Sequence, residues 1–322
     1  MLEIPWVEKY RPQKFEEIVS QSIAINNLRK FTQNPNIPHL IFAGPAGTGK
    51  TTTAQIIVKS FLKGDELTTN LLELNASDTV RIDFVRNILK NFVNQTLFKS
   101  GALKFVILDE ADNIPRQVQQ ALRRMIEKAS TNVKFILMCN YINRIIDPII
   151  SRCAVFRFVS LQEEKIVERL KYIAEQEKLQ IPDDKSENFF KQLYFISGGD
   201  LRKAINALQM SVALELSHDL DVSEILRISG FLDETTLNSL IISLKNRDFI
   251  KSREILGSIE TIDSRNFIRQ ISGVLPSLEI STENLSKLKA FFGEIDFRIN
   301  QGSDKKIQIL ALLGSIIEKI NH

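Results

Sequence analysis

The sequence has few of the residues that build disulfide frameworks or transition-metal sites. Its 322 residues include two cysteines, Cys139 and Cys153, and three scattered histidines. Two cysteines cannot form a framework of several bridges, and so few soft ligands exclude a zinc cluster, which indicates a reducing compartment. We therefore expect any bound metal to be held by oxygen ligands.

Long hydrophobic runs are also missing. The most apolar run near the C-terminus, residues 309–317, is far shorter than the about 20 residues that a membrane-spanning helix needs. The N-terminal residues lack the pattern of a signal peptide. We therefore expect an intracellular protein with no membrane partner.

The chain has no strong excess of charge of either sign. Its 42 basic residues nearly balance 39 acidic ones, which gives a formal net charge of +3. Any nucleic-acid surface must therefore come from local clustering of basic residues. The composition, 43% hydrophobic and 25% charged, is typical of a globular protein, and the length predicts several domains.

Between residues 38 and 158, short β-rich runs alternate with amphipathic helical patterns. HLIFAG, KFVILDEAD and VKFILMCN are typical of strands, whereas TTAQIIVKSFL and IDFVRNILKNFV are typical of helices. This alternation predicts an α/β fold with a parallel sheet covered by helices on both faces. After Ser160 only helical patterns follow, so we expect an α/β domain over 1–160 and all-helical domains over 161–223 and 224–322.

Residues 44–51, GPAGTGKT, match the phosphate-binding pattern G-x-x-x-x-G-K-[ST]. The match follows an apolar strand and precedes a helix, where backbone N–H groups and the helix N-terminus converge on phosphates. We expect Lys50 to reach the β- and γ-phosphates of ATP and Thr51 to hold Mg²⁺. The residues assigned to ATP are those of this segment and the next residue, namely Gly44, Pro45, Ala46, Gly47, Thr48, Gly49, Lys50, Thr51 and Thr52.

Acidic residues end another predicted strand, in FVILDEAD at 105–112. Ligands of α/β folds bind at the carboxyl edge of the sheet, which is where this strand would present its acids. Asp109 suits the Mg²⁺ shell, and Glu110 suits a base for the attacking water. An Asp-Glu pair also fits an ordinary solvated strand end, but the upstream phosphate loop favours the catalytic interpretation.

Three more polar residues have both a functional and an ordinary interpretation. Asn140 ends the strand pattern 134–140, and its amide would orient the water or contact the γ-phosphate, although Asn is also common in turns. Arg202 follows a glycine break near a helix start and would reach phosphates or remain an ordinary surface residue. Arg152 lies between the turn pair Asp147-Pro148 and a strand pattern, exposed, where no local feature requires it.

Taken together, these motifs resemble a known family. WVEKYRP at 6–12, GPAGTGKT, LELNASD at 72–78, LDEAD, QQALRRMIE at 119–127, CN at 139–140, SRC at 151–153 and GDLRKAINALQ at 199–209 occur in order. In order and spacing they are similar to the small subunits of replication factor C, the sliding-clamp loader of archaea and eukaryotes. The resemblance is dense over residues 1–215, while the last hundred residues match only in length and helical character.

The resemblance implies an AAA+ ATPase domain over 1–160, a three-helix lid over 161–223 and a helical collar over 224–322 that joins five subunits into a ring. It implies a subunit that binds and hydrolyses ATP to open the sliding clamp and load it onto primer-template DNA. The implied partners are the other clamp-loader subunits, the clamp and DNA. The implied location is the nucleus in a eukaryote and the cytoplasm in an archaeon.

The resemblance also assigns roles to single residues. Val7 and Arg11 would belong to the nucleotide pocket, with Asn140 as the first sensor and Arg202 as the second. Arg152, in the Ser-Arg-Cys triplet, would be the arginine finger that reaches the ATP of the neighbouring subunit, where such a residue is worth about 10³ or more in rate.

Basic residues after the second predicted strand are the implied DNA contacts. Arg81, Arg86 and Lys90 would line a helix facing the inside of the ring and touch phosphates without reading bases. A solvated basic helix face is the alternative for each of them.

The sequence departs from the family pattern at two places. Thr79, Val80 and Arg81 follow Asn-Ala-Ser-Asp where the family usually has an acid, Arg and Gly, which weakens any DNA contact assigned to position 80. Ala46 replaces a common proline of the phosphate loop but leaves its glycines, Lys50 and Thr51 intact, so nucleotide binding should survive.

Two other functions share part of these motifs. An AAA+ DNA-remodelling or branch-migration motor would have the same phosphate loop, acids and arginine finger, but we find no winged-helix or pore-loop element. A non-catalytic scaffold subunit of a clamp-loader ring would have degraded ATP residues, whereas Lys50, Thr51, Asp109, Glu110 and Arg152 are all present.

Overall fold

The computed structural model describes residues 4–34, 36–76, 82–94, 103–129, 132–179, 181, 183–214, 223–259 and 263–320. Its contacts divide the chain into two compact units, residues 1–179 with 193–208, and residues 180–192 with 209–322. Helices α9 (Asp183–Ser197) and α10 (Leu201–Ala213) each contribute residues to both units. The domain boundaries predicted at 160 and 223 remain a prediction.

The first unit is built on a five-stranded parallel sheet of order β2-β3-β4-β1-β5. Its strands are β1 (His39–Ala43), β2 (Leu71–Asn75), β3 (Lys104–Asp109), β4 (Val133–Cys139) and β5 (Cys153–Arg157). The α/β class and the parallel sheet predicted from the sequence are therefore confirmed. The order brings the carboxyl ends of β1, β3 and β4 together, because these three strands are adjacent at the centre of the sheet.

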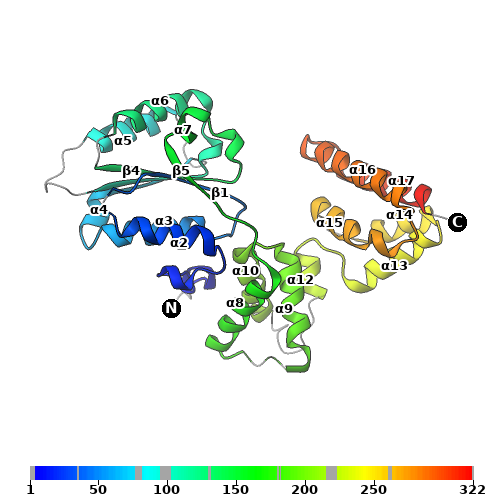
Figure 1. Ribbon diagram of the computed structural model, residues 1–322. Helices are drawn as coiled ribbons and strands as arrows, with labels where there is room; N and C mark the ends of the chain where they lie inside the picture. The colour runs from blue at the N-terminus through cyan, green and yellow to red at the C-terminus, as the bar shows by residue number, and fades with distance from the viewer. Residues whose placement is uncertain are drawn as a thin grey trace. The chain divides into compact units, whose positions relative to one another are not determined.

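Helices cover both faces of this sheet (Figure 1). On one face lie α2 (Ser22–Thr32) and α3 (Lys50–Phe61), and on the other lie α5 (Ile82–Asn94), α6 (Arg116–Lys128) and α7 (Asp147–Ile150). Alternate strand residues supply the two cores, since Leu40 and Phe42 pack on the α3 side and Ile41 on the α6 side. The central strands β1, β3 and β4 are buried on both faces and are accordingly almost continuously apolar.

Short elements complete the first unit. They are α1 (Trp6–Lys9), η1 (Phe15–Glu17), α4 (Glu66–Asn70), η2 (Ala111–Asn113), η3 (Ile142–Arg144) and the longer helix α8 (Glu163–Gln176). The predicted turn pair Asp147-Pro148 instead begins α7, because proline is well suited to the first turn of a helix. In α6, Val118 and Leu122 are buried, whereas Ala121 and Met125 are partly exposed.

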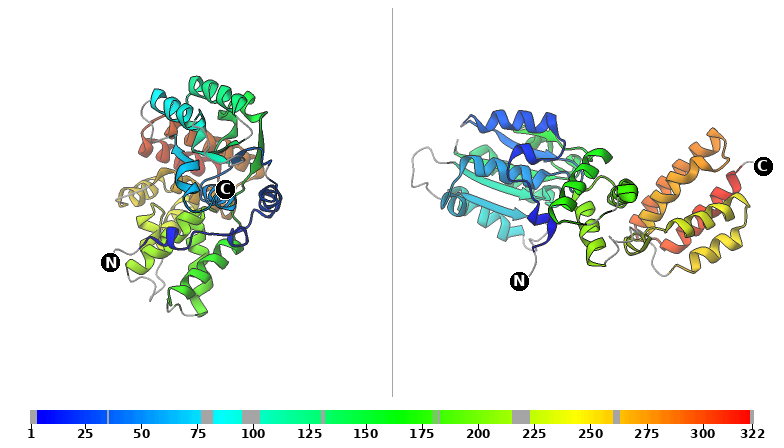
Figure 2. Two further views of the ribbon diagram at one scale, coloured as in Figure 1. Left: turned by 90° about the vertical axis from the view of Figure 1, so that its left-hand side faces the viewer. Right: turned by 90° about the horizontal axis from the view of Figure 1, so that it is seen from below.

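The second unit is helical in its described residues. It contains α12 (Ser223–Ile228), α13 (Glu234–Lys245), α14 (Phe249–Gly257), α15 (Ser264–Val274), η4 (Leu275–Ser277), α16 (Thr282–Asn300) and α17 (Lys305–Lys319). The yellow to red helices of Figure 2, α13 to α17, lie side by side, with α14 and α16 both packed on α17. They enclose one apolar core that includes Leu240, Phe267 and Leu312.

The sequence marks where these helices begin. The side chains of Asp233, Asp248, Asp263, Ser281 and Asp304 each accept a hydrogen bond from a backbone N–H in the first turn. Such caps satisfy N–H groups that have no partner inside the helix, and each is worth about 1 kcal/mol. None of the helices in the described ranges combines the length and apolar character needed to cross a membrane.

His39, at the start of β1, makes the stability of the first unit depend on pH. Its Nδ1 accepts a hydrogen bond of 3.1 Å from the backbone N–H of Phe135, and its ring packs against the Phe135 ring. Burial, helped by the charge of Lys134, lowers the pKa of His39 to about 4. His39 is therefore neutral in the folded protein at neutral pH.

We expect the free energy of unfolding to fall as the pH is lowered. The unfolded chain takes up a proton at His39 near pH 6.5, whereas the folded chain does so only near pH 4, so acid favours unfolding. The expected loss between pH 7.5 and 5 is about 2 kcal/mol. Denaturant titrations at both pH values measure it, and His39→Gln, which retains a hydrogen-bond acceptor but cannot titrate, should lose that part of the dependence. If the free energy of unfolding of His39→Gln depends on pH as strongly as that of the parent, the dependence comes from groups other than His39.

Candidate nucleotide site

The phosphate loop, residues 44–49, joins β1 to α3 and has the backbone that its glycines allow. Gly47 and Gly49 have φ values of 67° and 93°, in the left-handed region that favours glycine. A Cβ at Gly47 would lie 1.7 Å from Oδ1 of Asp200, so the approach of this loop to the start of α10 requires glycine. Asp200 in turn accepts a hydrogen bond of 2.9 Å from the backbone N–H of Arg202.

Lys50, the first residue of α3, is only 8% exposed and has all its hydrogen-bond donors engaged. Its Nζ donates to the carbonyls of Gly44 and Pro45, at 2.7 Å each, and to Oδ1 of Asn140 at 3.2 Å. Burial lowers the pKa of Lys50, and the carboxylate of Asp109 partly opposes this effect. The structure thus brings together the predicted phosphate-binding lysine and the predicted sensor from the end of β4.

The two predicted magnesium ligands also meet. The hydroxyl of Thr51 donates to Oδ2 of Asp109 at 3.0 Å, and Oδ1 of Asp109 accepts from the backbone N–H of Glu110 at 2.8 Å. The described residues contain no group of three or more His, Cys, Asp and Glu side chains that could hold a metal. A hydroxyl and one carboxylate fit Mg²⁺, which takes few protein ligands and completes its octahedron with phosphates and water.

Glu110, the predicted base, directly follows β3 in a strained backbone conformation. Its φ of 51° is in the left-handed region, which costs a residue with a side chain about 1–3 kcal/mol. Its carboxylate accepts a hydrogen bond of 3.1 Å from the side chain of Asn113. The two neighbouring acids thus have different partners, because Asp109 accepts from Thr51 and Glu110 from Asn113.

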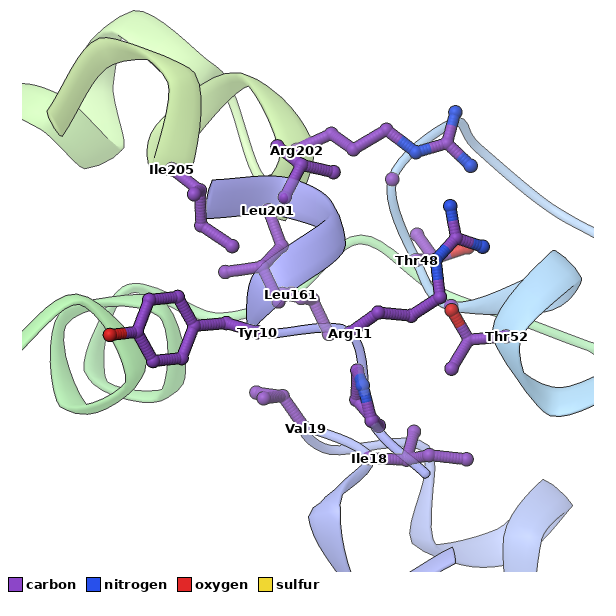
Figure 3. Close-up of a pocket in the computed structure, with 14 residues that line it drawn as sticks. Tyr10, Arg11, Ile18, Val19, Thr48, Thr52, Leu161, Leu201, Arg202 and Ile205 are labelled. Carbon is purple, nitrogen blue, oxygen red and sulfur yellow. The ribbon is translucent and has the colours of Figure 1, made fainter. Parts of the chain in front are cut away.

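A pocket lies beside the phosphate loop and takes its lining from several distant segments (Figure 3). The predicted residues Val7, Arg11, Gly47, Thr48, Gly49, Thr52 and Arg202 line it. Figure 3 shows the guanidinium groups of Arg11 and Arg202 on the same side of the pocket as Thr48. The structure therefore brings both predicted pocket arginines next to the phosphate loop, with Arg11 also paired to Glu8.

The sequence interpretation missed the apolar part of this pocket. Its additional lining residues are Tyr10, Pro12, Ile18, Val19, Leu161, Leu201 and Ile205. They come from the N-terminal segment, the residues after β5 and the start of α10, so no spacing in the sequence connects them. Two motifs were available signals: WVEKYRP includes Tyr10 and Pro12, and GDLRKAINALQ includes Leu201 and Ile205. Ile18, Val19 and Leu161 lie outside both motifs.

The N-terminal segment is held in place by α8. The hydroxyl of Tyr10 donates to Glu177 at 2.6 Å, and Lys9 donates to the same carboxylate oxygen at 2.7 Å. Arg169 donates to the backbone carbonyl of Tyr10 at 2.8 Å and stacks on Tyr172. These contacts anchor the chain immediately before Arg11 and so help to define one wall of the pocket.

Arg152 does not line this pocket. It precedes β5, an edge strand of the sheet, and its side chain is 40% exposed. It forms an ion pair of 2.7 Å with Glu127, which is distant in sequence, and donates to the carbonyl of Pro148 at 2.7 Å. The end of α6 lies beside β5, and Glu127 also accepts from Arg123 at 2.9 Å, a pairing that sequence distance concealed.

The predicted DNA-contacting residues are described only in part. Arg81 lies outside the described residues, as does the side chain of Arg86. Lys90 is exposed on α5. It lines a polar groove between α5 and α6 together with Asn87, Asn94, Gln117, Gln120, Arg124 and Lys128.

Two family profiles match the chain. The profile described as "ATPase family associated with various cellular activities (AAA)" matches residues 40–161. The profile described as "Replication factor C C-terminal domain" matches residues 233–315. Together they cover the phosphate loop, most of the sheet and most of the helical C-terminal region.

Curated relatives match over nearly the whole chain. The "Replication factor C small subunit 1" of Pyrobaculum islandicum is 39% identical over 99% of this chain and 97% of its own length. The "Replication factor C small subunit" of Saccharolobus solfataricus is 40% identical over 98% of this chain and 94% of its own length.

Solved structures share the fold at low sequence identity. The Thermotoga maritima RuvB Holliday junction branch migration motor is 19% identical, with a TM-score of 0.55 over 84% of this chain and 92% of that one. At this identity the likeness concerns the fold alone.

Proposed function

Because the chain belongs to the family of replication factor C small subunits, we propose that it opens a sliding clamp and loads it onto primer-template DNA within a five-subunit ring. It is a clamp-loader ATPase that acts in DNA replication. The AAA region binds the nucleotide, and the other subunits of the loader complex are its partners. The clamp, the DNA and the number of subunits are the proposed part.

The observation that carries this proposal is the position of Arg152, which is not among the residues that line the pocket beside the phosphate loop of its own subunit. Lys50, Thr51 and Asp109 contact one another or the phosphate loop in the same subunit. Arg152 instead lies at the edge strand of the sheet. A finger supplied by the neighbour would make hydrolysis depend on ring assembly.

The bound nucleotide would take over contacts that the protein now makes with itself. Phosphate oxygens are better partners for the Lys50 ammonium than the carbonyls of Gly44 and Pro45, because they carry negative charge and so add Coulomb attraction to the hydrogen bond. Thr51 and Asp109 would hold Mg²⁺, which neutralises charge on the β- and γ-phosphates when bound. Glu110 would accept the proton of the attacking water, and Asn140 would orient that water.

Arg152 would exchange partners in a similar way. Its ion pair with Glu127 lies at the surface, where such pairs are worth about 0–1 kcal/mol. A neighbour's triphosphate carries more negative charge and therefore competes effectively for the guanidinium. Glu127 keeps its second partner, Arg123, when Arg152 leaves.

The residues proposed for DNA phosphates are Arg81, Arg86 and Lys90, and their contacts would be independent of base sequence.

The proposed function is tested by ATP turnover in the assembled complex. We expect primer-template DNA and the clamp of the same organism, added together, to raise the rate at least several-fold over either one alone, because productive loading needs both. Chelation of Mg²⁺ should abolish turnover. A Lys50→Ala complex is the inactive reference, and Lys59→Ala, changed at an exposed lysine of the same helix, is the matched control. A rate that ignores both clamp and DNA would contradict the proposal.

A further inference from the structure

Asp112, the last acid of LDEAD, is buried but has no role in the chemistry described above. It lies in η2, one turn after β3, and is 8% exposed. Removing a carboxylate from water is unfavourable unless its oxygens receive hydrogen bonds. A charged group retained in such a place needs a physical account.

The contacts of Asp112 lead to the end of β4. Its Oδ2 accepts hydrogen bonds from two successive backbone N–H groups, those of Asn140 at 3.3 Å and Tyr141 at 3.1 Å. Its Oδ1 receives no hydrogen bond from any residue that the structure describes. One carboxylate oxygen thus fixes the backbone of Asn140 and Tyr141, directly after the end of β4.

The side chain held in this way faces the phosphate loop. Oδ1 of Asn140 accepts from Nζ of Lys50 at 3.2 Å, and Asn140 itself is exposed beyond the buried residues of β4. Among the described residues, Asp112 is the one side chain that forms a hydrogen bond with the backbone of Asn140. Without Asp112, two N–H groups would lose their acceptor and this turn could rotate.

We propose that Asp112 is a positioning residue for ATP hydrolysis, which holds the backbone of Asn140 and Tyr141 so that the Asn140 amide stays directed at the γ-phosphate. The inference rests on the proposed role of Asn140 as the sensor. Asp112 touches neither nucleotide nor water and acts through Asn140. Its charge is also near enough to Lys50 to favour the ammonium form, which is a secondary benefit.

The test is a double-mutant cycle on kcat in the assembled complex. Asp112→Ala should lower kcat about 10- to 100-fold, because displacing a catalytic group by about 1 Å can cost that much. The affinity for ATP should change less than about 3-fold, since the phosphate loop is untouched. In an Asn140→Ala background, Asp112→Ala should lower kcat less than about 2-fold further, because the group that it positions is already gone.

The conservative variant distinguishes the hydrogen bonds from the charge. Asp112→Asn retains an oxygen that can accept from both N–H groups, so kcat should stay within about 3-fold of the parent. Asp65→Ala, changed at an exposed aspartate before α4, is the control and should have parental kcat. If Asp112→Ala does not fold, Asp112→Asn decides alone, and a 10-fold loss of kcat in it would overturn the proposal.

Each other outcome is equally decisive. Equal losses from Asp112→Ala in the parent and Asn140→Ala backgrounds would show that Asp112 acts on the fold and not through Asn140, which overturns the inference. A parental kcat in Asp112→Ala would also overturn it. A parental kcat in Asn140→Ala would remove the proposed sensor role, and this inference with it, while leaving the clamp-loader assignment intact.

Discussion

Glu110→Gln is expected to lower ATP turnover about 10²- to 10⁴-fold while ATP affinity stays within about 3-fold of the parent. The glutamine cannot accept the proton of the attacking water, but it keeps the size of the side chain. Glu110 is not among the side chains that contact Lys50 or the phosphate loop, so binding should not depend on it. Single-turnover hydrolysis and equilibrium nucleotide binding, both on the assembled complex, separate the two effects.

Lys50→Ala provides the opposite profile for comparison. It removes the charge that would face the phosphates, so ATP affinity should fall at least about 10-fold, because hydrogen bonds to charged groups are worth about 1.5–3 kcal/mol. The matched control for Glu110→Gln is Glu73→Gln, which removes one negative charge from an exposed position on β2 of the same sheet. Equal losses of affinity in the Glu110 and Lys50 variants would contradict the separate roles.

Arg152→Ala should lower ATP turnover about 10³-fold or more in the assembled complex, yet leave ATP binding by the isolated subunit intact. Arg152 lies outside the pocket of its own subunit and is engaged by Glu127 and Pro148. In the proposed ring, its positive charge would stabilise a transferring phosphoryl group held by a neighbour. Arg157→Ala, at an exposed arginine at the end of β5, the strand that follows Arg152, should have little effect.

Mixed complexes test whether Arg152 acts across the interface. Arg152→Ala subunits have an intact Lys50, and Lys50→Ala subunits have an intact Arg152. An interface that pairs a good ATP site with a good neighbouring arginine should regain hydrolysis, provided that native mass measurements show mixed complexes. If mixed complexes form and none recovers turnover, Arg152 serves its own subunit or only the fold.

Much of the first unit could be predicted from local pattern. The apolar runs that became β1, β3 and β4 are buried on both faces of the sheet, and such runs have a strong, local signature. The caps that begin α13 to α17 are equally local, because each needs only one side chain and the next turn of backbone. The turn at Asp147-Pro148 was predicted incorrectly, since the same pair also suits the start of a helix.

The candidate site also has a part that local pattern predicts and a part that it does not. The residues within one motif, such as Gly47, Lys50 and Thr51, were predictable because their shared task fixes their spacing. Two other contacts could not be predicted in this way. The ion pair of Arg152 with Glu127 joins residues 25 positions apart, and the hydrogen bonds of Asp112 to the end of β4 join residues at least 28 positions apart. Such contacts depend on which strands are neighbours in the sheet.

The sequence by itself determined the α/β class, the phosphate loop, the acids after β3 and the resemblance to a clamp-loader family, since each depends on residue type and short-range order. Only the tertiary structure decided which residues form the apolar side of the pocket, where Arg152 rests and what Asp112 holds. The physical reason is that the strand order places β4 between β3 and β1, so acids, sensor and phosphate loop meet at one sheet edge. Periodicity along the chain carries no information on that order.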